Sequence, residues 1–323
     1  MRILVTGGAG AIGCNLVNRL LEDPMIEQVT VLDDLSSGYR ENVPDHPKVR
    51  FVEGSVTDES ALDGLFSSDR LDWVVHLAAS FANQTSVENP QKDLHVNGMG
   101  TLKLLEYAVK AKVKRLVYSS SSCVYGNQEG ILREDTEVFH TETPYAATKL
   151  LGERYLKFFH SYHDLDAVIL RFFNTYGPGE RPGRERNVIP NFLRLAMQKK
   201  PLPITGDGTE TRDFNYVDDT VTGVMAALKA PPGVGGKVFN LASGRETSIL
   251  ALAEEINRVT RNPAGIVFQN RRKWDTVLRR LASISEAKKY LNYVPRVPVK
   301  EGIRRTYVWL VAEDARTLNP VRS

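Results

Sequence analysis

Short apolar runs recur along the first three quarters of the chain, and each is short enough for a buried β-strand. Segments with helical spacing of apolar residues separate the runs, beginning with residues 14–23. This alternation predicts an α/β fold built on a doubly wound parallel sheet, with a smaller mixed α/β lobe after it. The strands are expected at residues 2–6, 28–33, 49–52, 73–77, 115–119, 167–172 and 238–241.

A glycine-rich segment joins the first expected strand to the first helical pattern. Gly7, Gly10 and Gly13 recur at every third position of GGAGAIG. Such a turn lets the backbone approach a pyrophosphate, which then lies at the positive end of the following helix. Asp33 ends the second strand, where a carboxylate can bind both ribose hydroxyls and repels a 2′-phosphate. A glycine motif alone would indicate an ordinary turn, but this context predicts an NAD site.

Tyr145 and Lys149 lie in the segment PYAATK, where a helix would place both on one face. A free tyrosine has a pKa near ~10 and is a poor base at neutral pH. A neighbouring ammonium group and an oxidised nicotinamide would both lower that pKa. The serine run Ser119–Ser122 ends an expected strand, at the sheet edge where ligands bind. An isolated pair of this kind is usually structural, whereas beside a glycine turn it indicates catalysis.

The 323 residues have room for a dinucleotide-binding domain and a substrate lobe. We expect the first domain at residues 1–173, with a later return near 213–242, and the lobe mainly at 174–323. The net charge of +3 does not indicate a protein that binds nucleic acid. We expect a cytoplasmic protein without membrane contact, because the chain opens in a core strand. Cys14 and Cys123 suggest no disulfide, and the scattered histidines predict no metal site.

These features resemble the extended short-chain dehydrogenase/reductase family, in particular its NAD-dependent nucleotide-sugar epimerase/dehydratase branch, which includes UDP-glucose 4-epimerase-type enzymes. The similarity covers essentially the whole chain. It implies NAD as cofactor and a nucleotide-diphosphate sugar as substrate. It also implies a homodimer formed through helices near residues 92–109 and 144–160. Further motifs that carry the resemblance are HLAA at 76–79, VNGMGT at 96–101, RFFNTYGPGERP at 171–182, NVIP at 187–190 and GDGTETRDFNYVDD at 206–219.

The resemblance implies roles for individual residues. Tyr145 would be the catalytic base, Lys149 would lower its pKa, and Ser121 would position the sugar 4-hydroxyl. The implied cofactor contacts are Gly7, Gly10, Ala11, Ile12, Gly13, Asp33, Ser37, Gly38, Ser55, Val56, Leu77, Ala78, Ala79, Asn97, Ser119, Tyr145 and Lys149. The implied substrate contacts are Phe81, Ser121, Ser122, Asn174, Asn187, Val188, Arg212, Arg272 and Asp275, with the two arginines on the diphosphate.

The expected reaction is epimerisation at C4 through a transient 4-keto sugar. Related 4,6-dehydratases carry an Asp-Glu pair where this chain has Ser122 and Cys123, and uronate decarboxylases carry glutamate in place of Cys123. Both reactions are therefore disfavoured. A 3,5-epimerase or epimerase/reductase using Cys123 as acid/base is an alternative, since the chain has the Ser-x-Cys spacing of such enzymes. Their second acid/base, a histidine or lysine, is missing from loop 179–186. A non-catalytic NAD sensor is disfavoured by the intact catalytic trio.

The resemblance is less specific about the substrate. Thr205 stands where an aromatic residue usually covers the nucleobase, so uridine is a default. Asn174 replaces a threonine common in uronate 4-epimerases, which favours an uncharged sugar. Arg279 and Arg280 are either phosphate contacts or part of a solvated face.

Overall fold

The computed structural model describes residues 1–68, 70–81, 83–128, 130–138, 140–183, 187–271 and 277–318. Its centre is a seven-stranded sheet in the order β12-β7-β5-β4-β1-β2-β3, and every neighbouring pair is parallel. The order runs outward in both directions from β1 and β4, which confirms the doubly wound α/β fold. The strands are β1 (Arg2–Thr6), β2 (Gln28–Asp33), β3 (Val49–Glu53), β4 (Trp73–His76), β5 (Arg115–Ser121), β7 (Ala167–Phe172) and β12 (Val238–Leu241).

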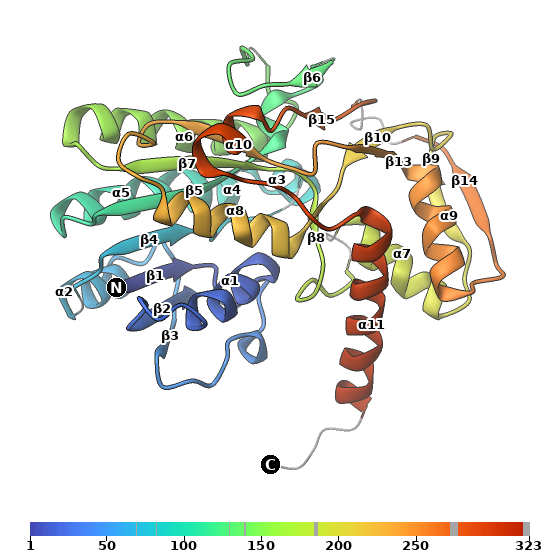
Figure 1. The fold of residues 1–323 in the computed structure, drawn as a ribbon, viewed down its shortest axis with the longest axis horizontal. Helices are drawn as coiled ribbons and strands as arrows, with labels where there is room; N and C mark the ends of the chain where they lie inside the picture. Colours follow the sequence, from blue (N-terminus) through green and yellow to red (C-terminus); the bar gives the residue numbers. More distant parts are fainter. Residues whose placement is uncertain are drawn as a thin grey trace.

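Helices cover both faces of this sheet (Figure 1). On one face, α1 (Ala11–Leu21) and α8 (Val217–Lys229) pack against strand residues such as Ile3 and Val5. On the other, α2 (Glu59–Ser68), α5 (Thr101–Lys110) and α6 (Pro144–His163) pack against residues such as Leu4. Successive strand residues thus enter opposite cores, and for this reason the strands are apolar throughout.

The segment between β4 and α5 contains an uncommon element. Two short helices, α3 (Asn83–Glu88) and α4 (Pro90–Asp93), lead into a π-helix, η2 (Leu94–Gly100). Beyond β5, the 3₁₀ turn η3 (Ser122–Tyr125) continues the serine run. A short 3₁₀ turn, η1 (Arg40–Asn42), follows β2. Pi-helical turns are rare and often occur at functional sites.

A smaller lobe lies at one side of the sheet (Figure 1). Its helices, α7 (Val188–Met197), α9 (Ile249–Thr260) and α11 (Val299–Leu318), pack on one another. Beside them β9 (Leu202–Thr205) pairs with β14 (Ile266–Gln269) in parallel, and β10 (Thr211–Asp213) with β13 (Glu246–Ser248) in antiparallel. The expected mixed lobe is therefore present. The domain boundary at residue 173 stays a prediction.

Two short strand pairs and one helix connect the lobe to the sheet. The pair β8 (Thr175–Tyr176) and β11 (Asn215–Tyr216) lies after β7, and β15 (Leu281–Ala282) pairs with β6 (Ile131–Leu132). Helix α10 (Ser285–Leu291) contacts β12 and α8. Through these contacts, residues from the C-terminal part of the chain lie against β6 and β12.

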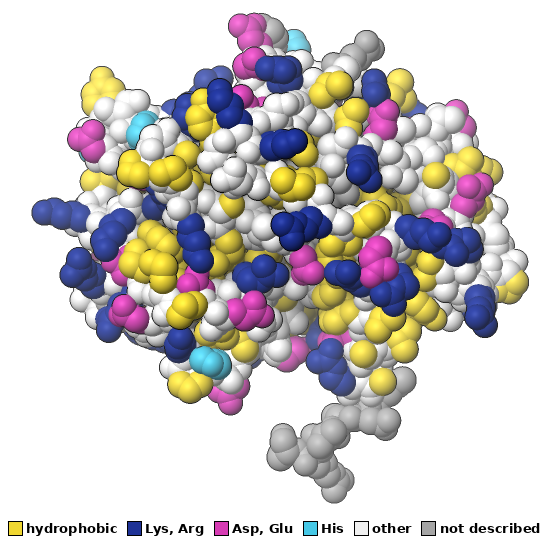
Figure 2. All heavy atoms as spheres, viewed as in Figure 1, with side chains coloured by type: hydrophobic (Ala, Val, Ile, Leu, Met, Phe, Trp, Pro, Cys, Tyr) yellow, Lys and Arg dark blue, Asp and Glu magenta, His cyan; other side chains and the backbone are white. Residues whose placement is uncertain are grey.

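The surface has no single electrostatic character on the face that Figure 2 shows, where basic and acidic side chains are interspersed. The mixture agrees with the small net charge of +3. Over the described ranges, the helices fall short of the length and apolar character required to cross a membrane. The homodimer stays a prediction.

Candidate active site

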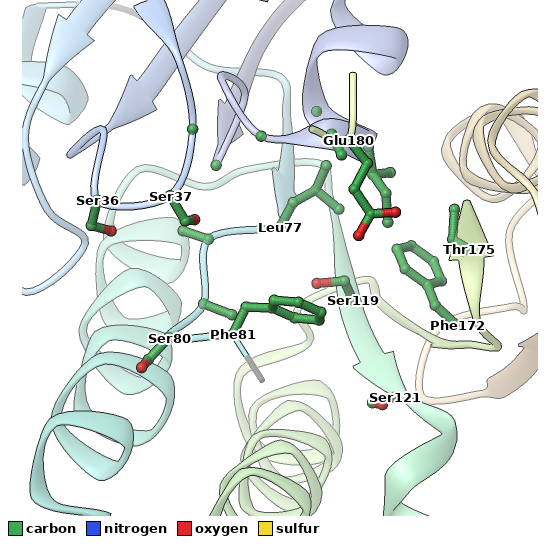
Figure 3. Close-up of a pocket in the computed structure, with 18 of the residues that line it drawn as sticks. Ser36, Ser37, Leu77, Ser80, Phe81, Ser119, Ser121, Phe172, Thr175 and Glu180 are labelled. Carbon is green, nitrogen blue, oxygen red and sulfur yellow. The ribbon is translucent and has the colours of Figure 1, made fainter. Parts of the chain in front are cut away.

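A cavity of about 950 Å³ opens at the carboxyl ends of the central strands. It lies where β1 and β4 adjoin, which is the point at which the strand order reverses. Doubly wound folds bind their ligands at this point. The turn after β1, the loop after β4, the end of β5, helix α6 and the loop after β8 all line it. Figure 3 shows Ser36 and Ser37 at one side of the cavity and Phe172, Thr175 and Glu180 at the other.

The glycine turn has room for a ligand but not for side chains. Gly7 has a φ of +73°, and a Cβ there would lie 2.6 Å from the Ala78 nitrogen. A Cβ on Gly13 would lie 2.2 Å from the Gly7 oxygen, so α1 packs directly on the turn. Gly10 caps α1 without a side-chain hydrogen bond. The first N–H groups of the helix therefore remain for an anion, and this cradle fits a dinucleotide pyrophosphate.

Asp33 lies at the end of β2 and lines the cavity. One carboxylate oxygen accepts the Ala9 N–H and the other accepts the Leu35 N–H, each at 2.9 Å. Burial raises the pKa of Asp33, while these two hydrogen bonds oppose the rise. Because each oxygen retains a further lone pair, the fixed carboxylate can also accept the hydroxyls of a ribose.

The opposite end of the cavity holds Tyr145 and Lys149, both buried in the first turns of α6. Pro144 begins this helix, and the Thr143 hydroxyl caps it by accepting the Ala146 N–H. Lys149 Nζ donates to the Ser119 carbonyl oxygen at 2.9 Å and lies 5.8 Å from the centre of the Tyr145 ring. The predicted helix thus places the phenol and the ammonium side by side.

Burial favours the neutral form of both side chains and shifts their pKa values in opposite directions. It lowers the pKa of Lys149 to about 8, against an opposing effect of Asp93. It raises the pKa of Tyr145 well above its ordinary value, and the Ser121 hydroxyl opposes this through a hydrogen bond. Tyr145 can act as a base only with added positive charge near its oxygen.

The four serines of the run lie in different environments. Ser119 Oγ donates to the His76 carbonyl at 2.9 Å, and Ser120 Oγ donates to the Glu153 carboxylate at 2.5 Å. Ser121 Oγ accepts the Cys123 N–H at 3.1 Å, and its hydroxyl opposes the rise in the pKa of Tyr145. Among the four, Ser121 is therefore the hydroxyl best placed to share a substrate oxygen with Tyr145.

Arg280 holds the turn that follows Ser121. Its buried guanidinium donates to the Ser122 carbonyl and, at 2.7 Å, to the Gly126 carbonyl. The neighbouring Arg279 instead forms an ion pair with Glu246. Arg280 thus takes neither of the expected roles, because it binds backbone oxygens inside the protein. Its partners are distant in sequence, so no local pattern could have revealed this.

Cys123 lines the cavity beside Tyr145. Its sulfur accepts a hydrogen bond from the Asn83 amide at 3.6 Å, and the Asn83 oxygen accepts one from Thr143 at 2.9 Å. Thr143 uses its oxygen as the α6 cap and donates its hydroxyl proton, which fixes the orientation of the Asn83 amide. Asn83 was not expected from the sequence, which carries no motif at that position.

The structure brings together most of the residues expected to contact ligands. Apart from Asn97, each expected cofactor residue lines the cavity, as do five of the expected substrate residues, namely Phe81, Ser121, Ser122, Asn174 and Asn187. Val188 and Arg212 do not line it; one Arg212 guanidinium nitrogen donates to the Thr211 carbonyl at 2.9 Å. Arg272 and Asp275 lie outside the described residues.

Glu180 and Lys92 are among the polar residues of the cavity lining that were not expected from the sequence. Glu180 is buried there and accepts the Asn187 side-chain amide at 2.9 Å. It belongs to the Pro/Gly-rich loop after β8, but its inward direction depends on the fold. Lys92 lines the cavity from α4 with an exposed side chain.

His76 is a core residue. Its ring nitrogens contact the hydroxyls of Thr6 and Thr101 at 2.7 and 3.0 Å. Burial lowers its pKa to about 3, so the ring is neutral. Among the described residues, histidine, cysteine and acidic side chains do not gather in groups of three or more that could hold a metal ion.

A doubly wound sheet, a glycine cradle and an apposed Ser-Tyr-Lys trio define an enzyme of the short-chain dehydrogenase/reductase type. Residues 3–242 match the profile of the NAD dependent epimerase/dehydratase family, and the chain belongs to that family. It is an NAD-dependent nucleotide-sugar epimerase.

Three relatives illustrate the similarity. An epimerase structure, Mth375 from Methanothermobacter thermautotrophicus, is 46% identical, with a TM-score of 0.94 over 97% of this chain and 93% of that one. A UDP-glucose 4-epimerase from Thermotoga maritima, solved with UDP-glucose, is 34% identical, with a TM-score of 0.91 over 99% and 100%. A UDP-glucuronate 4-epimerase from Thermodesulfobacterium geofontis is 34% identical over 95% of both chains.

Proposed function

We propose that this enzyme interconverts the C4 epimers of an uncharged UDP-hexose through a transient 4-keto sugar. The observation that carries the proposal is the buried Tyr145 phenol, which lines the cavity together with Ser121 and is flanked by Lys149. The similarity to UDP-glucose and UDP-glucuronate 4-epimerases supports C4 as the reacting carbon and uridine as the nucleoside of the substrate. Asn174 lines the cavity and favours the uncharged sugar of the two.

The cofactor would be held by groups already in place. The glycine turn would bind the pyrophosphate through the N–H groups at the start of α1, and Asp33 would bind the adenosine ribose. When bound, NAD supplies a positively charged hydride acceptor that later returns the hydride. The cavity lies between the turn and Tyr145, so substrate and cofactor would share it.

The protein itself moves one proton and orients the sugar. Tyr145 takes the proton of the 4-hydroxyl, and Ser121 donates a hydrogen bond to the same oxygen as it becomes a carbonyl. The Lys149 ammonium stabilises the phenolate before it takes this proton and again after the proton has been returned. After the sugar has turned its other face to the cofactor, Tyr145 returns the proton to the oxygen. Tyr145 therefore acts first as base and then as acid.

Epimerisation at C4 requires no further acid or base. The positions after Ser121 hold Ser122 and Cys123, so the carboxylate pair that would expel a 6-hydroxyl is not present there. The described part of the loop after β8 contributes Glu180 and Arg181 instead of the histidine or lysine that a 3,5-epimerase would use. The 3,5-epimerase is accordingly the second candidate, and Cys123 is the residue that would carry it.

Turnover in deuterated water tests the proposal. We expect UDP-glucose and UDP-galactose to interconvert with no deuterium in the sugar, because the C4 hydrogen travels as hydride and does not meet solvent. Products are identified by proton NMR, with UDP-glucuronate, UDP-N-acetylglucosamine and other nucleotide sugars as parallel substrates. Deuterium at C3 or C5 that disappears in Cys123→Ser would establish the second candidate. Bound NAD without turnover of any substrate would indicate a sensor.

A further inference from the structure

Asp93 is a fully buried carboxylate close to the catalytic pair but outside the cavity lining. It ends α4, directly before the π-helix η2, and its exposed fraction is 0%. One oxygen accepts the Thr148 hydroxyl at 2.6 Å, and the other accepts the Asn97 amide at 3.0 Å. Burial raises the pKa of Asp93, whereas the Thr148 hydrogen bond and the Lys149 charge favour its ionised form. Carboxylates are almost never fully buried unless they are paired in this way.

The two partners of Asp93 connect it to both sides of the active site. Thr148 immediately precedes Lys149 in α6. Asn97 lies in η2, and its amide oxygen accepts the Ser80 N–H at 2.8 Å. Ser80 in turn lines the cavity. Asp93 therefore joins the cavity wall, the π-helix and the helix that carries Tyr145 and Lys149.

Asp93 is also the negative charge that acts on Lys149. β5 places the Ser119 carbonyl and the Tyr118 ring against the ammonium, with Nζ 5.0 Å from the ring centre. β4 contributes His76, which is neutral, and α6 contributes the phenol of Tyr145. Among the described groups that face Lys149, Asp93 supplies the anionic charge.

We propose that Asp93 is a positioning residue. Its charge keeps Lys149 protonated, and its hydrogen bonds hold Lys149 beside Tyr145. The inference rests on the proposed function of that pair. Burial lowers the pKa of Lys149 to about 8, and Asp93 raises it. The same negative charge raises the pKa of Tyr145. Asp93 thus keeps the ammonium charged at neutral pH and makes the phenol harder to ionise.

The direction in which the pH profile of activity moves follows from the effects of Asp93 on these two pKa values. Activity requires Tyr145 deprotonated, which sets the acid limb of the pH profile, and Lys149 protonated, which sets the alkaline limb. Removal of the Asp93 charge lowers both pKa values. Both limbs therefore move to lower pH together. Loosened packing alone would instead reduce the rate by a similar factor at every pH.

The first test compares wild type with Asp93→Asn, which keeps the shape of the side chain and removes its charge. We expect both limbs of the kcat/KM profile to move down by about one pH unit, a tenfold change in each ionisation constant. Asp72→Asn is the matched control, since Asp72 pairs with Lys114 at 2.8 Å away from the cavity. Its profile should coincide with that of wild type. An Asp93→Asn profile that keeps both limbs at the wild-type pH and shows the same loss of kcat/KM at every pH would overturn the proposal.

The second test measures Lys149 without relying on catalysis. Protein labelled with ¹³C-lysine is titrated by NMR, and the Lys149 signal is assigned by its absence in Lys149→Met. We expect a midpoint near 8 in wild type, as burial dictates, and a lower one in Asp93→Asn. An unchanged midpoint would reject the inference. A lowered midpoint in a protein without epimerase activity would retain the charge inference and reject the proposed function.

Thr148→Val covers the case in which Asp93→Asn does not fold. This variant keeps the carboxylate but removes its 2.6 Å hydrogen bond. The loss of a stabilising donor raises the pKa of Asp93, but the carboxylate stays ionised near pH 8, where Lys149 titrates. We therefore expect an unchanged Lys149 midpoint and a kcat/KM that falls by a similar factor at every pH, because only the hydrogen bond that positions the start of α6 is lost. A kcat/KM equal to that of wild type would contradict the positioning role of Asp93.

Discussion

The two ends of the cavity are built from different material. At the cofactor end, backbone atoms of Gly7–Gly13 form the cradle, and Asp33 is fixed by main-chain N–H groups. At the catalytic end, side chains from distant segments meet, so that Arg280 reaches a carbonyl 158 residues away. The cofactor end is thus a property of the first two strands and of the turn and helix that join them. The catalytic end is a property of the whole fold.

This difference also separates binding from chemistry. A backbone cradle has a fixed shape and dipole, which suits a cofactor common to many enzymes. A buried phenol and ammonium, in contrast, depend on every charge and hydrogen bond around them. Changes at the catalytic end should therefore alter turnover and leave NAD binding intact, while changes at the cofactor end should alter the choice of dinucleotide.

The largest expected effect comes from Tyr145→Phe. The substitution removes the proton acceptor and preserves the ring, so kcat should fall about 10²–10⁴-fold, as is typical for the loss of a general base. NAD affinity, measured by fluorescence or calorimetry, should stay within about twofold, because a general base contributes to turnover rather than to cofactor affinity. Turnover close to that of wild type would remove the phenolate from the mechanism. A parallel loss of NAD binding would show that the two ends are not separable.

A smaller effect is expected from Arg280→Gln. The change leaves the buried Ser122 and Gly126 carbonyls without their shared donor, which costs about 1–3 kcal/mol for each unpaired group. Part of this loss should appear as a shift of the turn that carries Ser121. We expect kcat to fall about tenfold, ~1.4 kcal/mol, with the NAD affinity unchanged.

The adjacent residue provides the control for that experiment. Arg279 has a side chain that is 48% exposed and pairs with Glu246. Exposed pairs contribute about 0–1 kcal/mol, so Arg279→Gln should leave kcat within about twofold. Arg280→Lys should lie between the two, since a lysine donates to one carbonyl but lacks the guanidinium fork. Equal effects at both positions would mean that Arg280 does not position the serine turn.

The contrast explains what the sequence could predict. All seven expected strands, including 167–172 and 238–241, match their observed bounds within two residues. Glycine spacing and a Tyr-x-x-x-Lys pair are local patterns, and their geometry follows from a turn and a helix. Asp93 and Arg280 have no such signature, because their meaning depends on partners supplied by other elements. Arg212 is the opposite case. It lies in a recognisable motif, yet its side chain does not line the cavity.

The smallest expected effect concerns the choice between NAD and NADP at Asp33. Asp33→Asn keeps the size of the side chain and one acceptor oxygen, but it removes the charge that would repel a 2′-phosphate. The amide can also lose one of the two main-chain hydrogen bonds that fix the carboxylate. We expect the ratio of NAD to NADP affinity to fall about fivefold, ~1 kcal/mol, mainly through tighter NADP binding. Calorimetric titration of both dinucleotides measures this ratio directly. With NAD saturating, kcat should remain close to wild type, because Asp33 lies at the end of the cavity that binds rather than reacts. An unchanged ratio would mean that the backbone cradle alone selects the dinucleotide, and a large loss of kcat would connect the two ends that the structure separates.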